Sequence, residues 1–97
     1  MKTLEEWQKA FAEAAHAKFP NVWDNERRVQ SVQEQLDDVR AALKVERGEH
    51  VSDDHAHQNV DERIGALIAD ILILAEERGA HLEPELQKHL DWFKSRE

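Results

Sequence analysis

Apolar residues recur along the chain every three or four positions, which is the period of an α-helix rather than of a strand. The first series consists of Leu4, Trp7, Phe11 and Ala14. Thr3 and Glu6 stand at the spacing of a capping box, in which each side chain accepts a hydrogen bond from the other residue's backbone N–H. Pro20 disfavours helical conformation in the residue before it. We therefore expect a first helix from Thr3 to about Lys18, with Trp7 in the core.

A second apolar series predicts a second helix, from about Asp24 to Glu46. Its members are Val29, Val32, Leu36, Val39 and Leu43. They form a narrow stripe of the kind that packs on another helix. The polar segment GEHVSDDHAHQN then begins at Gly48 and shows no apolar period. We expect residues 48–59 to form a mobile loop.

Two further helices follow this loop. The segment IGALIADILILA lies in a helix that starts near Asn59 to Asp61 and stops at Gly79, a typical terminating residue. Pro84 is tolerated in the first turn of a fourth helix, whose apolar face contains Leu86, Leu90 and Phe93. Strand-type alternation is absent, so the sequence predicts one all-α domain over residues 1–97.

The third helix is apolar on most of its sides, as is typical of the centre of a bundle or of a subunit interface. A domain of this size buries only about two-thirds of its chain surface, and four short helices would cover such a helix incompletely. We therefore expect a four-helix bundle completed by homo-oligomerisation, for example as a dimer. The alternative is a compact monomeric bundle.

The charge balance excludes several classes of partner. The 97 residues include 21 Asp and Glu against 13 Lys and Arg, a net charge of −8. Nucleic-acid binders meet phosphates with clustered Lys and Arg, so we expect no nucleic-acid partner. The longest apolar run is shorter than the roughly 20 residues that span a membrane, so no membrane partner is expected either. Without cysteine or a signal-type start, the chain fits a cytoplasmic protein without disulfides or thiolate chemistry.

Three segments resemble the MazG-like, all-α NTP pyrophosphohydrolases: TLEEWQ at the start, VQEQLDDVRAAL from Val32, and LAEERGAHL from Leu74. In that family, EExxE and ExxD motifs on two neighbouring helices bring four carboxylates together around magnesium. The metal binds a nucleoside triphosphate, and an activated water releases pyrophosphate. The resemblance implies this activity, Mg²⁺ as cofactor, a (d)NTP as substrate, and assembly as a dimer or a dimer of dimers.

The metal-ligand positions depart from the family pattern. EExxE falls on EQLDD at 34–38, which places Gln35 at one ligand position. ExxD falls on RIGA at 63–66 without a gap, or on LIAD at 67–70 after a shift of one turn. The resemblance thus leaves Asp38 and Asp70 as candidate metal ligands, Glu34 or Glu62 to orient water, and Lys88 or Arg96 to contact phosphate.

Two interpretations of these positions remain open. One flank of the second helix carries Gln35, Asp38 and Ala42, and one flank of the third helix carries Arg63, Ala66 and Asp70. The two flanks meet if the helices pair antiparallel. Substrate phosphates and water could complete a weak magnesium site on Asp38 and Asp70. Alternatively, Arg63 brings a fixed positive charge to this place and pairs with one of the two aspartates, which we favour.

Other residues offer weaker signals. His50, His55 and His57 lie near Asp53 and Asp54 and could hold zinc or nickel weakly, but structural zinc sites need four preset ligands. Trp23 and Trp92 are open candidates for stacking on a base. Two functions follow: a MazG-like pyrophosphohydrolase of weak or lost activity, or a catalytically inert helical oligomer. The inert oligomer would bind a nucleotide or another small molecule, or serve as a structural or interaction module.

Overall fold

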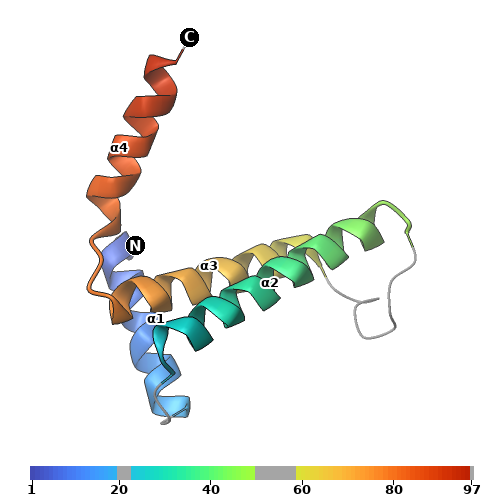
Figure 1. Cartoon of the computed structure of the whole chain (residues 1–97), viewed down its shortest axis with the longest axis horizontal. Coiled ribbons are helices and arrows are strands. Elements are labelled where there is room, and N and C mark those ends of the chain that lie inside the picture. The colour runs from blue at the N-terminus through green and yellow to red at the C-terminus, as the bar shows by residue number, and fades with distance from the viewer. Residues whose placement is uncertain (20–22, 50–58, 97) are drawn as a thin grey trace.

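The computed structural model describes residues 1–19, 23–49 and 59–96, and within these ranges all regular structure is helical (Figure 1). The helices are α1 (Leu4–Lys18), α2 (Asn25–Glu46), α3 (Val60–Glu77) and α4 (Leu82–Ser95). The all-α prediction is confirmed, and the helix ends lie close to the expected ones. Residues 50–58 of the expected loop, with its three histidines, lie outside the described part of the chain.

Local hydrogen bonds set the starts of the first three helices. The backbone N–H of Glu6 donates to Thr3 Oγ1 over 3.2 Å, and the backbone N–H of Thr3 donates to Glu6 Oε1 over 3.1 Å, so the predicted capping box is present. Asp24 caps α2 by accepting from the backbone N–H of Arg27, and Asn59 caps α3 in the same way. These contacts satisfy backbone donors that have no partner inside the helix.

Removal of the first cap gives a direct test of its contribution. We expect Thr3→Ala to lower the free energy of unfolding by about 1 kcal/mol, because the backbone N–H of Glu6 loses its acceptor. Urea unfolding followed by circular dichroism measures the change. Thr3→Ser is the matched control, since it keeps the hydroxyl, and it should stay within a few tenths of a kcal/mol of the wild type. Equal losses in both variants would contradict a role for the hydroxyl.

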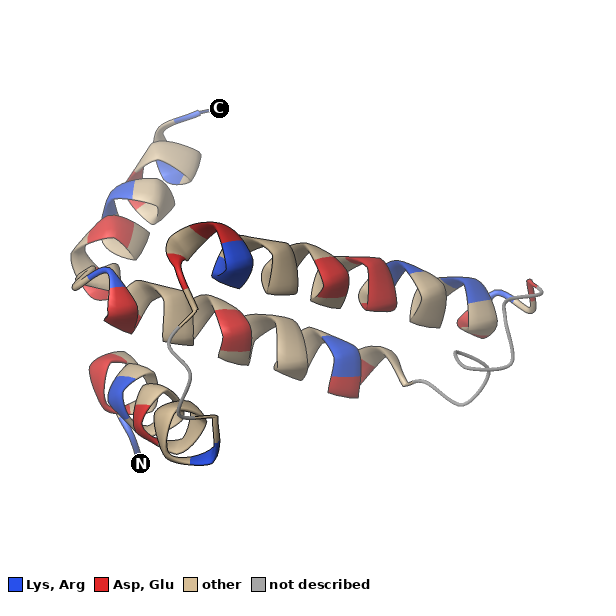
Figure 2. Ribbon diagram, turned by 60° about the horizontal axis from the view of Figure 1, so that its bottom comes forward, with Lys and Arg blue, Asp and Glu red and all other residues tan. Residues whose placement is uncertain are grey.

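Helices α2 and α3 lie side by side and run antiparallel, while α1 crosses near the end of α3 (Figure 1). The direction of α2 against α3 follows from two contacts: Ser31 meets Asp70, and Asp38, seven residues further on, meets Arg63, seven residues further back. Both signs of charge are distributed along these two helices (Figure 2). None of the helices in the described ranges is long and apolar enough to cross a membrane.

The core is small and contains a buried amide. Its fully buried apolar residues are Ala12, Ala42, Leu72, Ile73 and Ala75. Gln8 is only 1% exposed, and its Nε2 donates to the backbone carbonyl of Ala80 over 3.2 Å. The prediction that Trp7 belongs to the core is wrong: its ring is exposed and stacks on Phe11. The buried face of α1 instead runs through Gln8 and Ala12, one position further along the helix.

Helix α4 extends away from the other three helices (Figure 1). It contacts α1 and has no buried residue. Leu86, Leu90 and Phe93, which the sequence places on one apolar face, are 55%, 47% and 67% exposed. The fourth predicted helix is therefore present, but within one chain it does not lie alongside the α2–α3 pair. The four-helix bundle expected from the sequence is not completed inside this chain.

Candidate functional site

The two predicted flanks of α2 and α3 do meet, and an ion pair and a hydrogen bond join them. Arg63 Nη1 lies 3.4 Å from Asp38 Oδ2. Two turns away, the hydroxyl of Ser31 donates to Asp70 Oδ2 over 2.5 Å. Both pairs are partly buried, so they are less screened by solvent than surface ion pairs are.

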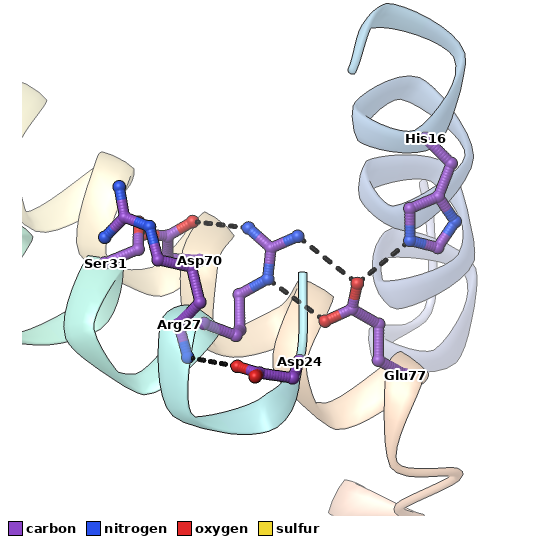
Figure 3. Close-up of polar contacts among 7 residues, drawn as sticks. His16, Asp24, Arg27, Ser31, Asp70 and Glu77 are labelled. Atoms are coloured by element: carbon purple, nitrogen blue, oxygen red, sulfur yellow. Dashed lines mark hydrogen bonds and ion pairs between the residues drawn. The ribbon is translucent and has the colours of Figure 1, made fainter. Parts of the chain in front are cut away.

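Arg28 forms the centre of a larger network at the start of α2. Its Nε and Nη2 donate to the two carboxylate oxygens of Glu77 over 3.0 and 3.2 Å, a bidentate arrangement. Its Nη1 lies 3.7 Å from Asp70 Oδ1. On the other side of the Glu77 carboxylate, His16 Nε2 of α1 approaches to 2.9 Å (Figure 3). One arginine and two carboxylates thus connect α2 to α3, and His16 adds α1.

The environment of Glu77 favours its charged form. Burial raises the pKa of its carboxyl group, but hydrogen bonds from Arg28 and His16, together with their charges, lower the pKa more, so that it lies below the ordinary value. The folded state therefore holds Glu77 ionised more strongly than the unfolded chain does. This contribution to stability is present above the ordinary pKa of a glutamate and is lost as the pH falls through the lowered value.

The two candidate metal ligands lie in separate places. Asp38 contacts Arg63, and Asp70 contacts Ser31 and Arg28, so each aspartate has an arginine beside it. Gln35, which stands at a family ligand position, has its amide oxygen buried without a hydrogen-bond partner among the described residues. The interpretation favoured from the sequence, a pair between Arg63 and one of the aspartates, is confirmed for Asp38.

The other four candidate residues are dispersed and exposed. Glu34 lies on α2, where Oε1 is 3.6 Å from Arg27. Glu62 lies in the first turn of α3. Lys88 and Arg96 belong to the α4 region, where Lys88 pairs with Glu85 and the guanidinium of Arg96 lies over a tryptophan ring. The structure does not bring these four side chains together with Asp38 and Asp70 in one site.

Sequence reasoning missed Arg28, Ser31 and Glu77, although a signal for them exists. Arg28 and Ser31 extend the flank of Asp38 by two further turns toward the start of α2, since all three share one helix face. Glu77 extends the flank of Asp70 by seven residues in the same way. Continuing each flank along the whole helix would have predicted one arginine facing two carboxylates.

The donor set does not fit a magnesium ion. Among the residues in the described ranges, no three His, Asp or Glu side chains are grouped closely enough to hold a metal. A cation beside Asp70 would also lie close to the Arg28 guanidinium, and like charges at short range repel strongly in a partly buried place. Magnesium prefers oxygen ligands in near-octahedral arrangement, whereas here each aspartate already faces a guanidinium.

Next to the Arg28 network, a cavity of about 210 Å³ opens at the junction of α1, α2 and α3. It is lined by Ala15, His16, Phe19, Trp23, Arg28, Ser31, Asp70 and Ile73. The guanidinium groups of Arg27 and Arg28 lie 4.5 and 4.7 Å from the centre of the Trp23 ring, which places this tryptophan by cation–π contact. Aromatic and aliphatic side chains therefore meet hydroxyl and carboxylate groups in one small space.

Comparison with known proteins identifies no relative. No family model, curated protein or solved structure matches the chain. Function is therefore inferred from the ion pairs and the cavity, together with the sequence resemblance.

Proposed function

We propose that this chain is a MazG-like helical domain that acts as a homo-oligomeric binding module: it holds a small planar ligand, such as the base of a nucleotide, and does not hydrolyse it. The observation that carries this proposal is the arginine beside each candidate ligand, Arg63 at Asp38 and Arg28 at Asp70. A fixed guanidinium supplies the positive charge that magnesium supplies in a pyrophosphohydrolase.

The cavity supports a ligand of limited size and mixed character. Its volume of about 210 Å³ lies below the roughly 300 Å³ at which sites for drug-sized ligands begin, which favours one or two fused rings. Phe19 and Trp23 offer aromatic surface, on which a planar ring packs well. Asp70 accepts one hydrogen bond from Ser31, and a carboxylate has room for further donors. An amino group or ring N–H of the ligand fits that role.

Titration with ligands distinguishes a binding module from an enzyme. We expect nucleosides, nucleoside monophosphates or triphosphates to change the tryptophan fluorescence of the protein equally with Mg²⁺ or with EDTA present. Trp23→Ala should weaken binding about fivefold or more, since stacking on an aromatic side chain contributes roughly 1–3 kcal/mol. Trp7→Ala is the matched control, since this exposed tryptophan of α1 does not line the cavity, and the variant should leave the affinity unchanged.

A pyrophosphate-release assay on the same samples tests the alternative function, which is hydrolysis of a nucleoside triphosphate. The resemblance and the retained Asp38 and Asp70 favour a weak hydrolase, which would release pyrophosphate from a (d)NTP in the presence of magnesium or manganese. We expect no turnover above buffer. Metal-dependent turnover that disappears in Asp38→Asn or Asp70→Asn would contradict the binding-module proposal and support the hydrolase.

A further inference from the structure

Arg28 and Asp70 face each other in the wall of the cavity without forming a hydrogen bond. Arg28 Nη1 and Asp70 Oδ1 are 3.7 Å apart, beyond the roughly 3.2 Å at which N–H···O hydrogen bonds end. The neighbouring atoms are engaged elsewhere: Arg28 Nε and Nη2 donate to Glu77, and Asp70 Oδ2 accepts from Ser31 (Figure 3). Among the described residues, one donor nitrogen and one acceptor oxygen thus lie side by side without a hydrogen-bond partner.

This donor–acceptor pair lies in a place where polar groups normally have partners. The side chain of Arg28 is 9% exposed and that of Asp70 is 13% exposed. Buried polar groups are nearly always hydrogen-bonded, because an unpaired one loses the free energy of its hydration. Both atoms remain accessible, since both residues line the cavity. A molecule in the cavity can therefore bind the donor and the acceptor together.

The charges of the pair select against ionic ligands. An anion placed here meets the carboxylate of Asp70, and a cation meets the guanidinium of Arg28; like charges repel strongly in a partly buried place. A neutral group with an N–H beside a carbonyl oxygen or a ring nitrogen satisfies both residues. Its N–H donates to Asp70 Oδ1, and its oxygen or ring nitrogen accepts from Arg28 Nη1. Planar carboxamides, lactam rings and amino-substituted heteroaromatic rings carry such an edge.

We propose that Arg28 and Asp70 recognise the edge of the ligand, so that the cavity takes a neutral planar ring with an N–H donor next to an acceptor. This inference rests on the proposed function and names its ligand class together with the two residues that select it. The rest of the wall is largely apolar, with Phe19, Trp23 and Ile73, as is usual for sites that bind rings through a few placed polar groups. The part of a nucleotide recognised here is the edge of its base, and its phosphates add no attraction.

Four ligands of nearly the same shape test this recognition on the full chain. Benzamide has both a donor and an acceptor, acetophenone has the acceptor alone, benzamidine is a cation with donors alone, and benzoate is an anion with acceptors alone. Chemical-shift titration by protein NMR measures the four dissociation constants. We expect benzamide to bind about tenfold or more tightly than each of the others, because each of the others loses a hydrogen bond to a charged, buried group.

A second pair of ligands distinguishes the two sources of such an edge. The lactam pyridone carries the donor and the acceptor within its ring, as a nucleobase does, and N-methylpyridone lacks the donor. If pyridone exceeds its methyl derivative by more than benzamide exceeds acetophenone, the preferred ligand is a base-like ring. The reverse order indicates a ring with a carboxamide substituent. Either order supports the recognition of a neutral donor–acceptor edge.

An alanine variant tests the role of Asp70. Asp70→Ala removes the acceptor and should reduce the preference for benzamide over acetophenone to about twofold or less. This ratio is informative because a general distortion of the cavity weakens both ligands alike. Asp91→Ala is the matched control: Asp91 also accepts one side-chain hydrogen bond, from Gln87, but it lies on α4, and the preference should remain. If Asp70→Ala loses its helical circular dichroism, the constants of the wild type decide alone.

The outcomes separate this inference from the proposed function. Equal binding of benzamide and acetophenone, or tighter binding of benzamidine or benzoate, overturns the inference and leaves a module that binds planar ligands. A preference that survives in a folded Asp70→Ala variant overturns it as well, and so does a chain that binds nucleosides but none of the four ligands. A chain that binds neither these ligands nor nucleosides contradicts the proposed function and the inference together.

Discussion

Replacement of Arg28 by methionine is expected to lower the free energy of unfolding by about 3 kcal/mol. The change removes the only guanidinium that contacts both Asp70 and Glu77 among the described residues, while both carboxylates stay partly buried. Loss of one partner from a buried ion pair is costly because the remaining charge is desolvated without compensation, typically by about 3–5 kcal/mol. We expect a cost at the low end of this range because the side chains of Asp70 and Glu77 are each still 13% exposed to solvent.

Urea unfolding at neutral pH and fixed protein concentration measures this effect. Arg27→Met is the matched control, since the neighbouring arginine is far more exposed and pairs with Glu34 at the surface. We expect its cost to stay below about 1 kcal/mol. Equal losses for the two variants would contradict the central role of Arg28.

The pH dependence of the same measurement tests the cause. Contacts with Arg28 help to hold the pKa of Glu77 below its ordinary value of 4.5, so this part of the stability is lost as the pH falls through the lowered pKa. The difference between the wild type and Arg28→Met should therefore shrink in acid. A difference that stays constant down to the lowest pH at which the protein folds would indicate that Arg28 acts through packing alone.

Leu72→Ala is also expected to lower the free energy of unfolding by about 3 kcal/mol. Leu72 is a large apolar side chain of the core with only 5% exposure, and its truncation removes apolar burial and leaves a cavity. Leu86→Ala is the matched control, because the same change at an exposed leucine of α4 should cost less than about 0.5 kcal/mol. Chemical unfolding of both variants at one protein concentration gives the comparison. Similar losses would indicate that α4 is packed as tightly as the core.

Local features of the fold could be predicted from the sequence. The capping box of Thr3 and Glu6 and the helix-terminating Gly79 each depend on residues only a few positions apart. The local sequence is therefore sufficient to predict them. The meeting of the Asp38 and Arg63 flanks also followed, because the helical period fixes which residues share a face and a pair of antiparallel helices brings two faces together.

Features that depend on contacts between distant segments could not be predicted in this way. Leu72 and Leu86 both lie on periodic apolar faces, and only the packing of the helices decides that one is buried and the other exposed. Gln8 is buried, and its amide donates to the carbonyl of Ala80, a partner that no spacing within α1 reveals. The Arg28 network joins residues 49 positions apart, and the arrangement of α2 against α3 determines that partnership.

Helix α4 also has a consequence for how stability is distributed. It has 14 residues and no buried side chain, and isolated helices shorter than roughly 12–15 residues are marginal in water. Its backbone hydrogen bonds therefore open locally at little cost in free energy, whereas those of α2 and α3 open only when the packed pair comes apart. Resistance to local unfolding is accordingly graded along the molecule: it is highest where Arg28 joins α2 to α3 and falls toward Arg96.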